Sequence, residues 1–332
     1  MHPFAETKYQ VISTAFALIL VACGAAPSMS DSAPEQVESA STAAPLDVAA
    51  PGEPAFFAGS LNGANEVPNG AAAGDEDRRA IAFMEIRGND VSFAIEFRGI
   101  EGLTAGHLHQ GAKGTNGPVK IPFFTTPVPC GQTSVSGTVR VDDPQLLDDI
   151  RSNPGNFYFN LHTEPFPDGA VRGQVHALSS AIDMKRALKQ NFRASVIRGA
   201  QIYACTVQAD GTFAFTQDNV RATLEGGISH FFVNPGPAGP PEWRARDGSA
   251  VTGRVTARIP NGAGNIAELH LAATQVGESR GRLAGIDEIL RLNTVGGVAP
   301  SGSCDPIKQP THAAPYQADY VFIDATGPHS DP

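Results

Sequence analysis

Basic residues are scarce in this chain of 332 residues. Lys and Arg number 24 against 34 Asp and Glu, which gives a formal net charge of −10. Proteins that follow a phosphate backbone carry clustered positive charge, so a nucleic acid is an unfavourable partner. After residue 22 the chain also lacks an apolar run of membrane-spanning length, for which a helix needs about 20 residues.

Aromatic residues make up only 7% of the chain, whereas Gly (35) and Pro (26) are abundant. Abundant turn formers exclude a helical bundle and favour many short strands. The sequence contains no P-loop and no H-E-x-x-H motif, so it gives no indication of a nucleotide-dependent or zinc-protease active site. We therefore expect two all-β domains and no enzyme activity.

The first 22 residues have the pattern of an export signal. Lys8 lies in a short polar start, and residues 11–22 form an apolar segment too short to span a bilayer. Leu-Val-Ala-Cys at 20–23 resembles the lipobox of bacterial lipoproteins. This resemblance implies that Cys23 carries lipid and anchors the exported protein in the bacterial envelope. Gly24 implies outer-membrane sorting by the enterobacterial rule, and ordinary secretion is the alternative.

Residues 23–54 are predicted to form a disordered tether. They are rich in Ala, Ser, Pro and acidic residues, and they include no Lys or Arg. Such a segment cannot bury enough apolar surface to become ordered.

Residues 55–177 are predicted to form the first β-domain. Apolar and polar residues alternate over 91–98, 135–141, 157–161 and 171–176, as expected for strands with one buried face. One helix is predicted over 144–152, with Asp143 as N-cap and Pro144 in the first turn. Many short strands with one helix indicate a β-sandwich or barrel.

Four sequence blocks in this domain resemble the CHRD domain, first described in chordin and widespread in exported bacterial proteins. In family order they occupy residues 61–68, 105–111, 153–163 and 169–174. The His-x-His pair at 107 and 109, followed much later by His162, also resembles the copper ligands of Cu/Zn superoxide dismutase, which is itself a β-sandwich. The bridging histidine, zinc loop and structural disulfide of that enzyme have no counterpart.

Three histidines are the candidate metal ligands. His107 and His109 are two apart on a predicted strand, so both project from one face while Leu108 faces the core. His162 lies on the face of its strand opposite Phe159. Imidazole suits copper and zinc, and we expect copper first and zinc second. The alternatives are that the imidazoles bond loop carbonyls and fix turns, or that they hold another ligand.

Arg172 is a further candidate at the end of this domain. We expect it to pair with Asp168 or Glu164, and the alternative is that it guides an anion toward a metal. Glu66 is expected to accept hydrogen bonds from the backbone rather than to act as an acid.

Residues 190–326 are predicted to form a second β-domain, joined to the first by an amphipathic stretch over 182–192 that resembles a helix. Several blocks resemble a family of exported β-domains of unknown function: 199–205, 230, 243–249, 293–304 and 316–320. Members of this family contain two cysteines, which correspond to Cys205 and Cys304. The resemblance therefore implies a Cys205–Cys304 disulfide, and Cys130 is expected to be free. We expect His230 to form a loop hydrogen bond and Trp243 to fill the core or a loop, with a sugar platform as the alternative for Trp243.

The sequence thus predicts a lipid-anchored envelope protein whose first domain binds copper or zinc. Its partners would be the membrane, through the lipid, the metal ion and another envelope protein. One alternative is a structural or protein-interaction module without metal. The other is a redox enzyme of the superoxide dismutase type.

Overall fold

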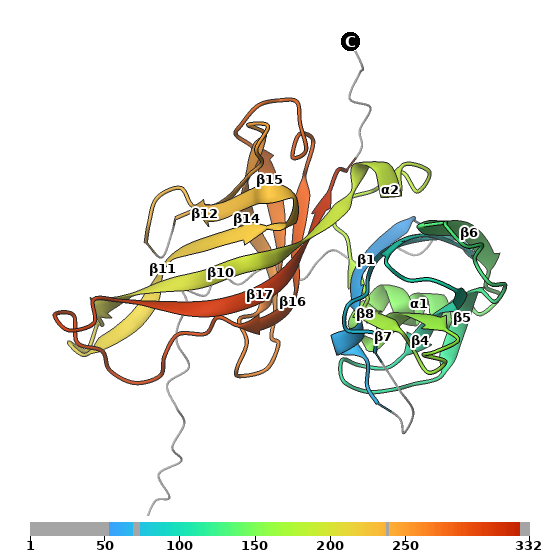
Figure 1. Cartoon of the computed structure of the whole chain (residues 1–332), viewed down its shortest axis with the longest axis horizontal. Helices are drawn as coiled ribbons and strands as arrows, with labels where there is room; N and C mark the ends of the chain where they lie inside the picture. Colours follow the sequence, from blue (N-terminus) through green and yellow to red (C-terminus); the bar gives the residue numbers. More distant parts are fainter. Residues whose placement is uncertain (1–52, 69–73, 237–238, 326–332) are drawn as a thin grey trace, which may run out of the picture. The chain divides into compact units, whose positions relative to one another are not determined.

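The structure is a computed structural model that describes residues 53–68, 74–236 and 239–325. It consists of two successive β-units (Figure 1), so the prediction of an all-β, two-domain fold is confirmed. The expected signal peptide, Cys23 and nearly all of the expected tether lie outside the described residues. In the described ranges, no helix has the length and apolar character needed to cross a membrane.

The first unit is a continuous antiparallel sheet with the order β5-β4-β7-β8-β1-β2-β3-β6, in which β9 also pairs with β1. Its strands are β1 Ala55–Asn62, β2 Arg79–Arg87, β3 Asp90–Arg98, β4 Leu103–Gln110, β5 Val119–Phe124, β6 Ser134–Arg140, β7 Phe157–Thr163, β8 Val171–Gln174 and β9 His176–Ala177. Short 3-10 turns occupy Gly63–Asn65 and Pro154–Asn156.

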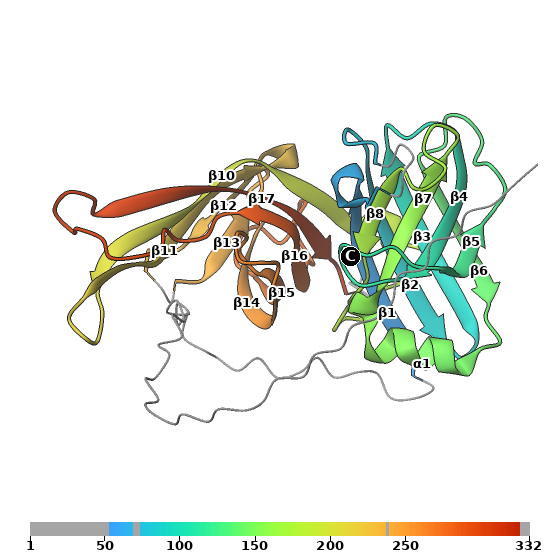
Figure 2. The same ribbon diagram turned by 90° about the horizontal axis from the view of Figure 1, so that it is seen from below.

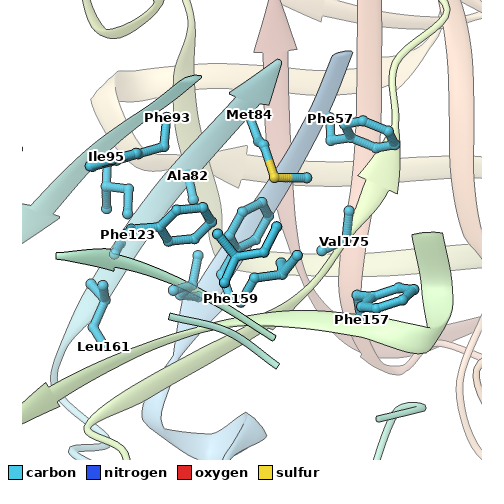
Figure 3. Packing of buried hydrophobic residues seen from close by; sticks show 14 of the residues in the cluster. Phe57, Ala82, Met84, Phe93, Ile95, Phe123, Phe157, Phe159, Leu161 and Val175 are labelled. Carbon is cyan, nitrogen blue, oxygen red and sulfur yellow. The ribbon is translucent and has the colours of Figure 1, made fainter. Parts of the chain in front are cut away.

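This sheet curls so that its apolar face encloses one core (Figure 3). Phe93 of β3 and Phe123 of β5 come from distant positions in the strand order, yet their ring centroids are 4.9 Å apart. Phe123 also lies near Phe159 of β7, with 6.0 Å between centroids. The predicted alternation is responsible, because it places these rings on the inner face of each strand.

The predicted helix is α1, Pro144–Ser152, which lies across one end of this unit (Figure 2). The Asp143 side chain accepts a hydrogen bond from the Leu146 N–H at 3.1 Å and caps the helix. Leu147 and Ile150 are buried in the same core as the strands. Both the boundary and the cap are therefore as predicted.

The second unit is a closed barrel of eight antiparallel strands in chain order. They are β10 Phe192–Val207, β11 Phe213–Leu224, β12 Ile228–Phe232, β13 Pro241–Arg244, β14 Ala250–Ile259, β15 Glu268–Gln275, β16 Glu288–Gly296 and β17 Thr311–Ile323. A 3-10 turn, Glu225–Gly227, joins β11 to β12. Pairing of β10 with β17 closes the barrel.

The stretch before the barrel is less helical than predicted. Only α2, Ala187–Gln190, is an α-helix, and residues 182–186 form turns and irregular backbone. Phe192 already belongs to β10, where it pairs with Phe322 and stacks on its ring. The amphipathic pattern assigned Phe192 to a helix, but its pairing with Phe322 makes it part of a strand that closes the barrel.

Candidate metal centre

The three candidate ligands converge on one side of the first unit. His107 and His109 lie on β4 and His162 on β7, and these two strands are antiparallel neighbours. The register places His162 opposite Ala105, so its side chain is a diagonal neighbour of His107. One nitrogen from each ring lies within 4.8 Å of the other two. Leu108, between the two histidines of β4, is buried in the core as expected.

Backbone carbonyls fix the tautomers of two rings. His109 Nδ1 lies 2.9 Å from the Gly117 carbonyl oxygen, and His162 Nδ1 lies 2.9 Å from that of Pro167. A carbonyl only accepts hydrogen bonds, so each Nδ1 carries the proton and each Nε2 presents a lone pair. The expectation that the imidazoles bond loop carbonyls is thus correct for two of them, and it is compatible with metal binding, because such bonds orient metal-ligating histidines.

Two of the ring nitrogens are joined by a hydrogen bond, and a third has no partner. His107 Nδ1 lies 3.1 Å from His162 Nε2 and donates the hydrogen bond that joins them, since His162 Nε2 can only accept. His109 Nε2 is buried and has no hydrogen-bond partner in the described part of the chain. A buried nitrogen lone pair without a partner is uncommon in proteins, and a metal ion would satisfy it.

The separations suit a single ion after a small adjustment. Copper and zinc bind imidazole nitrogen at about 2.0–2.1 Å, so two ligands of one ion are at most about 4 Å apart. The largest separation in the triad is within 4.8 Å. The nitrogens would therefore have to approach one another by less than about 1 Å to bind one ion, which a small rotation of the side chains would allow.

All three rings are neutral at physiological pH. Burial and, to a lesser extent, the neighbouring His162 and His109 lower the pKa of His107 from 6.5 to about 4. Burial also lowers the pKa of His109 and of His162, against the opposing effect of their backbone hydrogen bonds. Neutral imidazole is the form that binds metal, so the site is preorganised electrostatically as well as geometrically.

The triad faces a surface pocket. Its lining includes the three histidines together with Thr104, Val119, Glu164 and Asp168. An ion held by three protein nitrogens would keep an open position toward this pocket, for water or a partner group.

Arg172 does not pair with Asp168 or Glu164, and that prediction is wrong. Its guanidinium donates hydrogen bonds to the carbonyls of Ala112 and Thr115, at 3.1 and 2.8 Å, and to Asn116 Oδ1 at 3.2 Å. The Arg172 side chain is buried, and its guanidinium carries several N–H donors in a fixed fork, so that it can bond several acceptors of one loop at once. It therefore holds the loop over residues 112–116.

Tyr158 connects Arg172 to the triad and was not recognised from sequence. The Arg172 guanidinium carbon lies 3.5 Å from the centre of its ring, and the His109 ring stacks on Tyr158 with 4.9 Å between centroids. The Gly117 N–H donates to the Tyr158 hydroxyl at 3.2 Å. Arg172 and Tyr158 thus both support the loop that ends at Gly117, whose carbonyl orients His109.

Glu66 differs from its expected role. Its Oε1 is buried without a hydrogen-bond partner in the described residues. Burial raises the pKa of Glu66 to about 8, although Arg172 opposes this. The carboxyl is therefore protonated at neutral pH rather than an anionic acceptor for backbone N–H groups.

The remaining candidates lie in the barrel. Cys205 and Cys304 form the expected disulfide, and Cys130 is free and exposed. Trp243 fills the barrel core, as expected. His230 lies within β12 and donates from Nδ1 to the carbonyl of Glu242 in β13 at 3.0 Å, so its partner is a strand rather than a loop.

Residues 277–281 read G-x-S-x-G, a pattern that we did not expect in this sequence, and the structure does not make it a nucleophile elbow. A hydrolase nucleophile elbow needs a strand, a sharp turn and then a helix. Here residues 277–281 form bends after β15, and no helix follows before β16.

The comparisons with known families agree with this architecture. Residues 57–175 match the family model of the CHRD domain, so the first unit is a CHRD domain. Residues 221–324 match a second model, described as a protein of unknown function (DUF3455), so the barrel contains a DUF3455 domain. No curated protein and no solved structure matches the chain.

Proposed function

We propose that the CHRD domain binds one copper or zinc ion through His107 Nδ1, His109 Nε2 and His162 Nε2. The observation that carries this proposal is the buried, unpartnered Nε2 of His109 beside two further imidazole nitrogens. An ion there would replace the His107–His162 hydrogen bond and would satisfy all three nitrogens. His107 would then carry its proton on Nε2.

Copper is the preferred ion. The donors are three neutral imidazoles, a set that suits both metals, and divalent copper binds a given nitrogen site more tightly than zinc does. No carboxylate or thiolate belongs to the candidate cluster within the described residues.

The proposed role is metal binding rather than superoxide chemistry. Arg172 makes hydrogen bonds to a loop and is not directed at the pocket as an anion guide. Glu164 and Asp168 line the pocket, and negative charge at its mouth favours entry of a cation over an anion such as superoxide.

The proposed location is the bacterial envelope. The lipobox ending at Cys23 supports lipid anchoring, and Gly24 supports the outer membrane. Both residues lie outside the described part of the chain. A metal-binding domain held at a membrane by a tether would retain its ion at the cell surface or in the periplasm.

Electron paramagnetic resonance of protein loaded with Cu(II) tests the proposed ligand set. We expect one species with hyperfine splitting from several nitrogens, and equimolar Zn(II) should displace only part of it. A spectrum of aqueous or nonspecific Cu(II), with no nitrogen splitting, contradicts the proposal and supports an interaction module without metal.

A further inference from the structure

The two edges of the CHRD sheet differ in how they are protected. The sheet runs from β5 to β6, so each of these strands leaves one side of its backbone without a partner strand in the described residues. β5 carries Lys120 and Pro122, and its pairing with β4 contains two register shifts. Charged residues, prolines and bulges keep an edge strand from pairing with another chain. The sequence of β5 therefore blocks that edge.

The opposite edge, β6, has none of these devices. Its first six residues, Ser134 to Val139, include neither a charged residue nor a proline. The strand pairs with β3 over seven consecutive positions without a register shift. Figure 2 shows β6 at the margin of this unit. A regular and uncharged edge strand is a template for pairing with a further strand, so β6 offers an interaction surface.

The hydrogen bonds at both ends of β6 show which backbone groups point outward. The Phe97 N–H donates to the Thr133 carbonyl at 2.9 Å, and the Val141 N–H donates to the Asn89 carbonyl at 2.8 Å. In an antiparallel pair every second residue exchanges such bonds with the neighbouring strand. The odd-numbered residues of β6 therefore bond to β3. The N–H and C=O groups that point to the open edge belong to Ser134, Ser136, Thr138 and Arg140.

The side chains of β6 alternate in the same way. Val135 and Val139 pack against the core on the inner face of the sheet. The even-numbered residues are exposed on the outer face, where the Thr138 hydroxyl oxygen lies 2.9 Å from that of Ser92 on β3. The open edge thus has apolar side chains on its inner face and hydroxyl groups on its outer face.

We propose that β6 pairs antiparallel with β6 of a second copy of the chain, about a two-fold axis at Gly137. This register places Val135 beside Val139 of the second copy on the inner face. On the outer face it places Ser136 beside Thr138 of the second copy. The even-numbered residues then face one another, so their outward N–H and C=O groups find partners. Gly137 faces its own copy, where the lack of a side chain lets the backbones approach to the roughly 4.5 Å of a non-hydrogen-bonded pair.

The charges of the two copies are compatible in this register. Arg140 is the charged residue of β6, and it lies beside Ser134 of the second copy. Ser134 pairs on its other side with Glu96 of β3, so the guanidinium enters a row that already carries negative charge. The two Arg140 residues lie about 20 Å apart, at opposite ends of the paired strands. Like charges directly opposite one another would destabilise the strand pair, and this register avoids them.

A contact made by one strand from each copy is small. Stable interfaces bury about 1,200–2,000 Å², so we expect a reversible dimer with a dissociation constant in the micromolar range. Sedimentation equilibrium of the full-length protein measures this constant. All proteins carry Cys130→Ser, so that no disulfide joins two chains through the exposed thiol.

Two substitutions at one position separate the backbone from the side chain. Ser136→Pro removes an outward N–H and no bond to β3, and the two-fold axis doubles the loss. The dissociation constant should therefore rise at least about tenfold. Ser136→Ala keeps the N–H and is the matched control, with an affinity equal to that of wild type. Circular dichroism checks that each variant folds.

Hydrogen exchange of wild type decides if Ser136→Pro does not fold. The Ser136 and Thr138 amides should be protected at high protein concentration and exchange fast after dilution, whereas the Val135 amide, bonded to β3, should stay protected at both. A wild type that is monomeric at millimolar concentration overturns the proposal, in favour of an extended segment of a different protein as the occupant. So does wild-type affinity in folded Ser136→Pro or, where that variant fails, exchange that does not depend on concentration.

Discussion

His107 Nδ1 lies 3.1 Å from His162 Nε2, although the two residues are 55 positions apart in sequence. The antiparallel pairing of β4 with β7 brings them together. Their hydrogen bond occupies the space in which a shared ion would sit, so binding requires His107 to move its proton to the other nitrogen. The proposed metal binding would therefore need a change of tautomer at His107 in a cluster that is already formed, and no ligand would have to be brought in from elsewhere.

The loop held by Arg172 should matter for metal affinity, although Arg172 is not a ligand. Replacing it with Met removes its hydrogen bonds to Ala112, Thr115 and Asn116 and loosens the loop that orients His109. Loss of such outer-shell support typically weakens metal binding by about 10–100-fold. Competition titration with a chromogenic chelator measures the effect. Arg98→Met, at an exposed ion pair with Glu96, is the control, and equal affinity in both variants contradicts this role.

The disulfide should stabilise the barrel and not the CHRD domain. It joins positions separated by 99 residues. In the chain-entropy model, a cross-link that closes a loop of this size in the unfolded chain stabilises the folded state by at most about 4.7 kcal/mol. The double change Cys205→Ala and Cys304→Ala should lower the free energy of barrel unfolding by up to this amount. Urea unfolding followed by Trp243 emission measures it. Cys130→Ala should leave the curve unchanged, and a double variant as stable as wild type would refute the prediction.

His230 should make the barrel acid-sensitive. Burial lowers its pKa from 6.5 to about 3, so below pH 6.5 the unfolded chain takes up a proton that the folded barrel excludes. Stability from this residue is complete above pH 6.5 and falls by about 1.4 kcal/mol per pH unit below it. The His230→Asn variant loses the stacking on Trp243 at every pH, and it has no imidazole at this position, so its stability lacks this pH dependence.

The stability gap between wild type and His230→Asn should therefore narrow as the pH falls from 7 to 5. Urea unfolding at both values, followed by Trp243 emission, gives the gap. Because both proteins share every other titrating group, the comparison isolates His230. A gap that stays constant or widens would show that His230 is protonated in the folded barrel.

Cys23 should carry lipid in cells. Metabolic labelling with a clickable fatty acid should mark wild type and not Cys23→Ser, which should remain uncleaved or leave the membrane fraction, because the acyl chains supply membrane affinity. Cys130→Ser is the matched control and should label normally. Equal labelling of the Cys23→Ser protein and wild type would end the lipoprotein interpretation.

Local patterns predicted much of this fold. Alternation located Phe93, Phe159 and their strands, and Asp143 located the start of α1, because these signals depend on neighbours in sequence. The pairing of β4 with β7 brings His162 to His107 and His109, and the sequence indicated this only through block order and side-chain direction. Long-range contacts were harder to predict. Arg172 had carboxylates nearby in sequence, yet the loop carbonyls that fold over it from residues 112–115 satisfy it instead.

The central claim is tested most directly by counting metal ions on the purified full-length protein. Wild type, His107→Ala, His162→Ala and His312→Ala are loaded with Cu(II), dialysed, and measured by mass spectrometry of the metal against protein concentration. His312 lies on β17 of the barrel and does not belong to the triad, so it serves as the matched control. We predict one copper per chain in wild type and His312→Ala, and a large loss in the two triad variants. Retention of no metal by wild type, or equal retention by all four folded proteins, would contradict the account and leave the histidines as supports of the turns they contact.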